Sequence, residues 1–398
     1  MKVVLFAPSD AYLLNFRGAL AAALVDAGHD VLLVSPPGPD GDRLVAKGFR
    51  WIPAPMARAS VNPLRELWLI FWLYRLLRRE KADLVHGFII KGALYGALAG
   101  RMAGVPARVS SITGMGYLFL SQQRLARALR ALVRMLCRLA FTGSGAKVIL
   151  QNQDDLVLFR QERLARADKL VMIPGSGVDC QRFAPADSGD KLGPAADSVP
   201  GEWSRFRVLL PARLLWHKGL REYVEAARIL RAQGRSVDFL LAGEPDPSNP
   251  SSIPQLTIDG WVRSGLVQWL GYVDDMPGLM QSVDVVVLPS YREGLPKVLV
   301  EGAGCALPLI TTDVPGCREV VNDGVEGLLV PVGNAQALAV AIMRLQDDPM
   351  ARRTMGQLAR SKALAQFEEG IIISRIFGVY GDLLPGFDAT GYTRALSA

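Results

Sequence analysis

The apolar residues of this chain gather in short β-branched runs that are separated by stretches with helical spacing. In the first half the runs lie at residues 3–6, 31–35, 84–88, 107–111, 147–150 and 170–173, with helical patterns such as 16–27 and 92–103 between them. In the second half they lie at residues 207–211, 237–242, 267–272, 283–288, 307–311 and 327–330. Strands that alternate with helices of ten or more residues form parallel sheets with right-handed crossovers. The pattern therefore predicts an α/β fold.

The pattern is interrupted once, and the interruption divides the chain. Residues 185–200 are rich in Pro, Gly, Ser and Asp and have no apolar period, which is typical of a linker. A length of 398 residues also suits two domains. We predict an N-terminal domain at 1–184, a linker at 185–206, a C-terminal domain at 207–365 and a helical segment at 366–398 able to pack back onto the N-terminal domain. Both domains are expected to be doubly wound and Rossmann-like, facing each other across a ligand-binding cleft.

Composition limits where the protein works. Half of the residues are apolar and 21% are charged, the balance of a globular protein with sizeable cores. The longest apolar run, 67–74, is far shorter than the roughly 20 residues that span a bilayer. Four scattered cysteines have no metal-ligand or disulfide spacing, which favours free buried thiols in a reducing compartment. These features predict a cytoplasmic protein.

A net charge of +7 calls for an anionic partner. Residues 122–142 combine leucines and arginines at helical spacing and contain no acid, and the segment 64–79 is rich in aromatic residues and ends in arginines. The leucines of the first segment are Leu125, Leu129, Leu132, Leu136 and Leu139, and its arginines include Arg127, Arg130, Arg134 and Arg138. Such basic amphipathic helices favour peripheral contact with the inner face of an anionic membrane over nucleic acid, for which no reader motif is present. The alternative is that both leucine stripes pack on the sheet and the arginines are merely solvated.

The segment 289–301 carries the clearest chemistry. A buried strand runs into a turn, and Pro296 is typical of a helix start, because its missing N–H would be unpaired there. The amides from Gly294 to Lys297, with the positive end of the helix dipole, would make a phosphate site. Glu293 and Glu301 flank this site. One carboxylate is expected to reach the hydroxyls of a sugar and the other those of a ribose.

A second cluster, 211–219, also follows a strand and opens a helix. Arg213 and Lys218 are placed there to approach one anion, and a guanidinium with an ammonium suits a diphosphate. Together with the amides after Glu293, they would balance the roughly two negative charges of a leaving nucleoside diphosphate without a metal. The alternative is that each is an ordinary surface cation.

The pairing of Arg213 and Lys218-Gly219 with Glu293-Gly294-Leu295-Pro296 and Glu301 resembles retaining glycosyltransferases of family 4, which have the GT-B fold. The segments 173–179 and 271–275 are also similar to that family's usual sequences. Within the family, the segments 57–63, 212–219 and 289–294 resemble enzymes that extend lipid-diphosphate-linked sugars, such as the N-acetylgalactosaminyltransferases that act on undecaprenyl-diphosphate carriers. Related enzymes serve O-antigen, capsule and protein glycan assembly, so the resemblance does not fix the pathway.

The resemblance implies roles for particular residues. Arg213 and Lys218 would bind the donor diphosphate, Glu301 the ribose and Glu293 the donor sugar. The family often has a histidine near the end of its fourth strand that touches the donor sugar. His86 and Lys91 are the nearest candidates here, although a plain strand-end histidine is the alternative for His86. Further donor contacts are implied at Gly243, Tyr272, Val273, Gly294, Leu295, Pro296 and Lys297, and acceptor contacts at Asn15, Lys91, Gly114 and Gly116.

The same resemblance implies transfer of a hexose or N-acetylhexosamine from a UDP-sugar to a polyprenyl-diphosphate-linked saccharide with retention of configuration. We expect no metal and no other cofactor. Arg17, near the predicted start of the first helix, is expected to meet the diphosphate of the acceptor. Two alternatives stay open at this point: a UDP-sugar 2-epimerase on the same fold, and a non-catalytic scaffold that binds sugar nucleotides.

Overall fold

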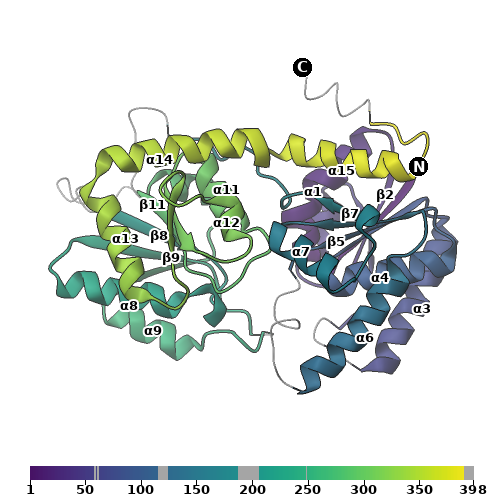
Figure 1. The fold of residues 1–398 in the computed structure, drawn as a ribbon, viewed down its shortest axis with the longest axis horizontal. Coiled ribbons are helices and arrows are strands. Elements are labelled where there is room, and N and C mark those ends of the chain that lie inside the picture. Colours follow the sequence, from purple (N-terminus) through teal and green to yellow (C-terminus); the bar gives the residue numbers. More distant parts are fainter. Residues whose placement is uncertain (58–59, 61, 115–123, 187–205, 248, 390–398) are drawn as a thin grey trace. The chain divides into compact units, whose positions relative to one another are not determined.

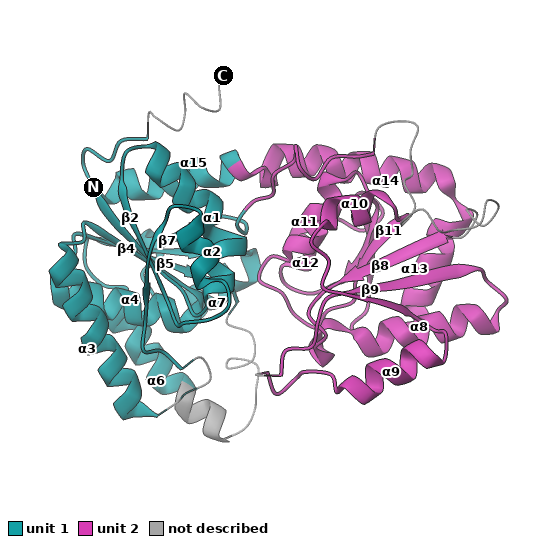
Figure 2. Cartoon of the chain, turned by 180° about the vertical axis from the view of Figure 1, so that it is seen from behind, with its two compact units in different colours: residues 1–176, 370–398 teal, residues 177–369 magenta. Residues whose placement is uncertain are grey.

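The computed structural model describes residues 1–57, 60, 62–114, 124–186, 206–247 and 249–389, and in the first six residues of the helix Arg124–Ala140 only the backbone. The described chain forms two compact units, Met1–Ser176 with Gly370–Ala398 and Gly177–Glu369 (Figures 1 and 2). Each unit is an α/β domain built on a parallel sheet, which confirms the predicted fold class. The predicted linker lies mostly outside the described residues.

The sheet of unit 1 has the strand order β3-β2-β1-β4-β5-β6-β7, with every neighbouring pair parallel. Its strands are β1 (Lys2–Phe6), β2 (Asp30–Ser35), β3 (Arg50–Pro53), β4 (Leu84–Phe88), β5 (Ala107–Ile112), β6 (Ala146–Leu150) and β7 (Leu170–Met172). Its helices are α1 (Asp10–Asp26), α2 (Gly41–Ala46), α3 (Pro63–Glu80), α4 (Ile89–Ala103), α6 (Arg124–Ala140), α7 (Gln153–Gln161), the short η1 (Ala167–Lys169) and α15 (Glu369–Leu383).

The sheet of unit 2 has the strand order β10-β9-β8-β11-β12-β13, also parallel. Its strands are β8 (Phe206–Pro211), β9 (Val237–Ala242), β10 (Gln268–Gly271), β11 (Val285–Leu288), β12 (Leu309–Thr312) and β13 (Gly327–Val330). Its helices are η2 (Trp216–Lys218), α8 (Leu220–Ala232), α9 (Gln255–Arg263), α10 (Met276–Gln281), α11 (Lys297–Gly304), α12 (Cys317–Val320), α13 (Ala335–Asp347), α14 (Pro349–Lys362) and the π-helical η3 (Ala363–Phe367).

Every predicted strand is present, and the sequence pattern missed one. The strand β3 lies at the edge of its sheet and reads Arg-Trp-Ile-Pro, too short and polar to stand out. The first helix was placed wrongly at 16–27, because it begins at Asp10, where the Ser9 side chain accepts a hydrogen bond from the Tyr12 amide. Arg17 therefore lies two turns inside the helix and not at its start.

Alternate residues of the central strands feed opposite cores, as a sheet covered on both faces requires. In unit 1, Val3 and Leu5 pack with α1 and α15, whereas Val4 and Phe6 pack with α3. The last helix, α15, contributes several fully buried side chains, Tyr380 among them, to the first of these cores. All four cysteines are free and buried.

The two basic helices do not bury all of their apolar residues. In α6, Cys137 and Ala140 pack inward, but Leu132, Met135 and Leu139 are about half exposed. In α3, Leu69, Leu73, Leu76 and Leu77 are buried, while Leu64, Leu67, Trp68 and Phe71 are exposed. The alternative in which both leucine stripes pack on the sheet is therefore wrong for Leu132 and Leu139. Among the described residues, no helix is both long and apolar enough to cross a membrane.

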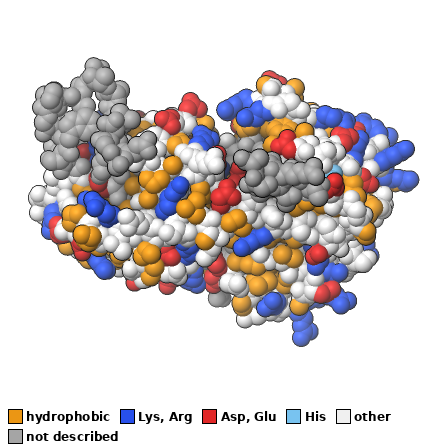
Figure 3. Space-filling view, turned by 90° about the horizontal axis from the view of Figure 1, so that it is seen from above, with side chains coloured by type: hydrophobic (Ala, Val, Ile, Leu, Met, Phe, Trp, Pro, Cys, Tyr) orange, Lys and Arg blue, Asp and Glu red, His pale blue; other side chains and the backbone are white. Residues whose placement is uncertain are grey.

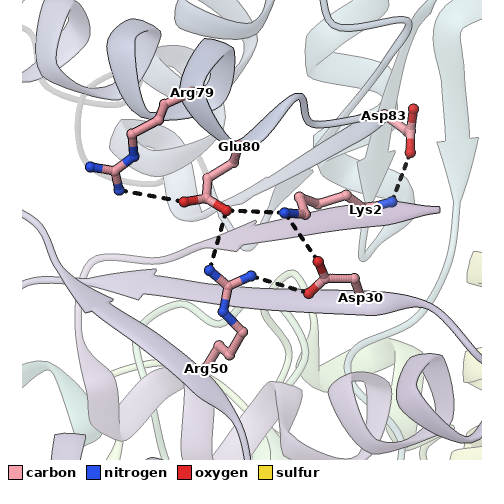
Figure 4. Close-up of polar contacts among 6 residues, drawn as sticks. All are labelled: Lys2, Asp30, Arg50, Arg79, Glu80 and Asp83. Carbon is pink, nitrogen blue, oxygen red and sulfur yellow. Dashed lines mark hydrogen bonds and ion pairs between the residues drawn. The ribbon is translucent and has the colours of Figure 1, made fainter.

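A network of charges closes the amino-terminal edge of the unit 1 sheet (Figure 4). The Lys2 ammonium lies 3.1 Å from carboxylate oxygens of both Asp30 and Glu80, and the Arg50 guanidinium bonds the same two acids. Burial alone would raise the pKa of Glu80, but the hydrogen bonds and charges of Lys2 and Arg50 outweigh it and lower that pKa below 4.5. The network thus joins the starts of β1, β2 and β3 to the end of α3.

Replacing Glu80 by Gln is expected to lower the free energy of unfolding of unit 1 by about 1 kcal/mol at pH 7. Because the folded pKa of Glu80 is depressed, its contribution is complete above the ordinary carboxyl pKa and is lost as the pH falls through the lowered value. The stabilities of wild type and E80Q measured by urea unfolding should therefore differ at pH 7 and converge as the pH falls through the lowered pKa of Glu80. The control is E225Q, which breaks an exposed pair with Arg228 on unit 2. Equal stability of E80Q and wild type at pH 7 would contradict the assignment.

Candidate active site

The order of strands in unit 2 reverses between β8 and β11, which are hydrogen-bonded neighbours. In open α/β sheets, ligands bind outside the carboxyl ends of the strands at such a reversal. The loops that leave these two strands are residues 212–219 and 289–296, the two segments in which the sequence predicted chemistry. Topology therefore brings both predicted clusters to one place.

The two loops touch through their backbones. Gly219 has φ = 78°, and a Cβ there would lie 2.0 Å from the Pro289 carbonyl oxygen, so this position requires glycine. The carbonyl of His217 accepts hydrogen bonds from the Tyr291 amide (2.9 Å) and from the Ser290 hydroxyl (3.1 Å). The Tyr291 hydroxyl donates to Glu222 on α8 at 2.8 Å, which fastens the second loop to the helix that follows the first.

An ion pair joins the side chains of the same loops. The Lys218 ammonium donates to Glu293 Oε1 at 2.5 Å, and both side chains are less than a fifth exposed. The Glu293 amide donates to the Pro315 carbonyl at 3.3 Å. Gly316 packs against the same backbone, since a Cβ there would come within 2.4 Å of the Gly294 oxygen. Glu293, which lies in the loop after β11, is thus held by contacts with the loops after β8 and β12.

Arg213 and Glu301 border this pair. The Arg213 guanidinium bonds Asp246 at 2.8 Å and remains half exposed, so it can still turn toward a ligand. Glu301 lies on α11 with its carboxylate 3.7 Å from the Lys297 ammonium. Burial raises the pKa of Glu301, and the charges of Lys297 and Arg182 oppose that rise in part.

The other predicted donor residues lie at the same edge of the unit 2 sheet. The helix α11 begins at Lys297 with Pro296 as its N-cap, one residue after the expected start. Gly243 follows β9 with φ = 132°, and a Cβ there would lie 2.1 Å from the Ala212 oxygen. Tyr272 and Val273 follow β10; Tyr272 is exposed and Val273 is partly buried. Gly294 and Leu295 belong to the loop that precedes α11.

The order of strands in unit 1 reverses between β1 and β4. Arg17 lies beside this point, only 3% exposed, with its guanidinium carbon 4.5 Å above the centre of the Phe88 ring. Its Nη2 donates to the Tyr12 hydroxyl at 3.0 Å, while its Nε is buried without a partner. No carboxylate among the described residues pairs with Arg17. A buried cation without a counter-ion is costly, which marks this position as a candidate anion site.

His86, for which contact with the donor sugar was predicted, is fully buried. Its Nδ1 lies 2.6 Å from the Tyr380 hydroxyl and its Nε2 lies 2.7 Å from the Ser111 hydroxyl, so both ring nitrogens are occupied. Burial, helped by the charge of Arg17, lowers the pKa of His86 well below its ordinary value. A neutral, doubly bonded imidazole supports the strand end, as the alternative reading of this residue expected.

Lys91, a predicted acceptor contact, has three hydrogen-bond partners within unit 1. Its ammonium donates to the carbonyls of Ala57 and Ser60 and to Glu66 Oε1, at 2.9 to 3.0 Å. Lys91 thus ties the segment before α3 and the first turn of α3 to α4. Of the remaining predicted acceptor residues, Asn15 is exposed on α1, Gly114 follows β5, and Gly116 lies outside the described residues.

Several residues that shape the site had no signal of their own in the sequence. Asp246 follows β9, and Thr312 ends β12, where its hydroxyl donates to the Ser290 carbonyl. Their contacts with the site depend on which strands are neighbours, and this is not visible in the sequence. The one available signal was that Asp246 follows a predicted parallel strand. Within the described ranges, no group of His, Cys, Asp and Glu side chains is arranged to hold a metal ion.

Two family models match this chain on either side of the predicted linker. Residues 16–175 match the glycosyl transferase 4-like domain, and residues 205–348 match the glycosyl transferases group 1 domain. Together with the two Rossmann-like units and the paired loops of unit 2, these matches define a glycosyltransferase of the GT-B class. The chain belongs to the family that combines these two domains, and the family models favour an enzyme over the scaffold alternative and a glycosyltransferase over the 2-epimerase.

Similar curated proteins have related activities. The chain is 28% identical to N,N'-diacetylbacillosaminyl-diphospho-undecaprenol alpha-1,3-N-acetylgalactosaminyltransferase of Campylobacter jejuni, over 96% of this chain and 98% of that protein. It is 26% identical to UDP-Gal:alpha-D-GlcNAc-diphosphoundecaprenol alpha-1,3-galactosyltransferase of Escherichia coli, over 82% of each chain.

Solved structures agree on the fold. HepE of Anabaena, in complex with UDP, has a TM-score of 0.73 at 21% identity and is matched over 96% of this chain and all of that one. Sucrose-phosphate synthase of Thermosynechococcus elongatus has a TM-score of 0.76 at 20% identity, over 96% of this chain and 99% of that one.

The substitution G219A tests whether the backbone contact between the two loops is required. The new Cβ would clash with the Pro289 oxygen at a residue with positive φ, so we expect unit 2 to lose at least about 2 kcal/mol of stability. Differential scanning calorimetry measures the loss.

The matched control is G260A, because Gly260 lies inside α9 with nothing within 4 Å of a built Cβ. It is expected to be neutral or stabilising by up to about 1 kcal/mol. If G219A were as stable as G260A, the contact between the loops would not be needed.

Proposed function

We propose that this glycosyltransferase moves an N-acetylhexosamine or hexose from a UDP-sugar to a saccharide linked to a polyprenyl diphosphate. The observation that carries the donor half is the Lys218–Glu293 pair at the β8/β11 reversal, beside Arg213 and the start of α11. The acceptor half is supported by the uncompensated cation of Arg17 in unit 1. The two similar curated enzymes both act on undecaprenyl-diphosphate-linked sugars, and HepE binds UDP.

Each donor-site residue has a task in this proposal. Arg213, Lys218 and the first amides of α11 take the diphosphate, whose charge they balance as it leaves. Glu301 binds the ribose hydroxyls, and Glu293 orients the donor sugar while its carboxylate stays paired with Lys218. In order of expectation, the sugars are N-acetylgalactosamine, N-acetylglucosamine and galactose. O-antigen, capsule and protein glycan assembly all use such products.

We further propose that the reaction retains the configuration of the anomeric carbon. The acceptor hydroxyl forms its bond to that carbon on the face from which the phosphate oxygen departs, and the leaving diphosphate takes the hydroxyl proton. This route needs no side chain to take the proton, and Glu293 Oε1 already accepts a hydrogen bond from the Lys218 ammonium at 2.5 Å. The contribution of the protein is positioning and charge stabilisation.

We propose peripheral contact with the inner face of an anionic membrane through α3 and α6. Both helices pack against α4, and Ile70 of α3 contacts the cluster that holds Cys137 of α6. Their exposed apolar residues stand beside arginines, as in helices that lie in a headgroup layer. In Figure 3, Lys and Arg side chains also gather at the right-hand end of the view, which is part of unit 1.

The transfer is tested with radiolabelled UDP-sugars and a polyprenyl-diphosphate-linked saccharide. Product is expected from the wild type, whereas K218Q and E293Q should each reduce kcat at least about a hundredfold. K218Q removes a positive charge that faces the departing diphosphate, and E293Q removes the carboxylate that orients the donor sugar. R17Q is expected to raise the acceptor KM about tenfold and leave the donor KM unchanged. The control is R228Q, an exposed arginine on α8 away from the loops.

An epimer formed without acceptor would overturn the proposal, and so would full activity of E293Q. An unchanged acceptor KM for R17Q would overturn the role of Arg17 alone.

Metal independence is tested separately. Since two cations and a helix start are available for the diphosphate, activity after dialysis against EDTA is expected to stay within about twofold of the untreated enzyme. An enzyme that EDTA silences and manganese restores would refute this part.

A further inference from the structure

Unit 1 contains a groove that none of the predicted roles uses. It has a volume of about 720 Å³, within the range of small-molecule sites. Its lining is mainly apolar and includes Pro37, Pro53, Met56, Trp68 and Trp72.

The groove lies at the same edge of the sheet as Arg17. Strands β2 and β3 end at Ser35 and Pro53, so the residues that line the groove after them belong to the carboxyl edge. The loop that contains Pro37 continues to Asp40, whose amide donates to Asp10 at the start of α1 with a 2.9 Å distance. One loop therefore borders both the groove and the amino end of the helix that carries Arg17.

The groove also has a cation in its wall. Arg65 lines it and is exposed, and no carboxylate among the described residues pairs with its guanidinium. The neighbouring Glu66 is neutralised by Lys91 at 2.9 Å. The groove therefore presents hydrocarbon surface with one uncompensated positive charge, which complements an amphiphile that has an apolar chain and a phosphate head.

We propose that this groove binds the first isoprene units of the acceptor's polyprenyl chain, with Arg65 near the diphosphate. The inference rests on the proposed acceptor class and adds a site that discriminates isoprenyl diphosphates from diphosphates without a chain. Exposed Trp68 forms one wall of the groove, and Trp72 and Met56 lie deeper. A longer isoprenyl chain would therefore bury more apolar surface and bind more tightly. Leu67, on the neighbouring face of α3, does not line the groove.

The test is calorimetric binding of isoprenyl diphosphates of five and ten carbons, in solution without lipid. Burying the second isoprene unit should make the ten-carbon ligand bind at least about tenfold more tightly to the wild type. We expect W68S to bring the ratio of the two affinities, ten-carbon over five-carbon ligand, near one. The L67S variant is expected to have the same ratio as the wild type. R65Q is expected to weaken both ligands by the same factor and leave the ratio unchanged.

The outcomes separate the groove from the rest of the proposal. The proposal for the groove would be overturned by an affinity ratio near one in the wild type. It would also be overturned if W68S kept the wild-type ratio, or if L67S lost the ratio as fully as W68S. If W68S keeps the ratio but loses binding to anionic vesicles, Trp68 serves membrane contact instead. A tenfold ratio in an enzyme that transfers no sugar would leave the groove standing and refute the proposed function.

Discussion

The proposed donor site of this enzyme depends on the close approach of two loops that leave adjacent parallel strands. Gly219 lets the backbone of the first loop rest against Pro289 of the second, and the Lys218–Glu293 pair then forms across them. Neither loop defines a site alone. Lys218 and Glu293 are 75 positions apart in sequence, and they meet because β8 and β11 are neighbours at the reversal of strand order.

Unit 1 repeats the same topology and uses it differently. Its reversal between β1 and β4 carries a buried guanidinium over an aromatic ring and a neutral histidine, and none of the acids in the described part of the chain pairs with that guanidinium. The helix α15, far along the chain, supplies Tyr380 to hold that histidine. A buried cation without a carboxylate partner favours a ligand that carries a negative charge. The adjoining apolar groove favours a ligand that also has a hydrocarbon chain.

The fold was largely predictable because parallel strands buried on both faces give near-continuous apolar runs, which the sequence displays at twelve places. The exceptions have local causes. The edge strand β3 is half polar, and α1 starts earlier than its apolar pattern because Ser9 and Asp10 form its beginning in a polar stretch. Arg213, Lys218 and Glu293 could be predicted as site residues because they lie between a strand and the following helix, positions that sequence can identify. Glu301 lies one turn inside such a helix.

Sequence alone therefore determined the class of fold, which loops carry charged residues and the family of the enzyme. These depend on residue type and on spacing along the chain. The tertiary structure decided which groups meet. It paired Arg213 with Asp246, gave both ring nitrogens of His86 hydrogen-bond partners, directed the Lys91 ammonium to two backbone carbonyls and to Glu66, and left Leu132 and Leu139 of α6 about half exposed. Each of these outcomes depends on contacts between residues distant in sequence, and such contacts are fixed only when the sheets assemble.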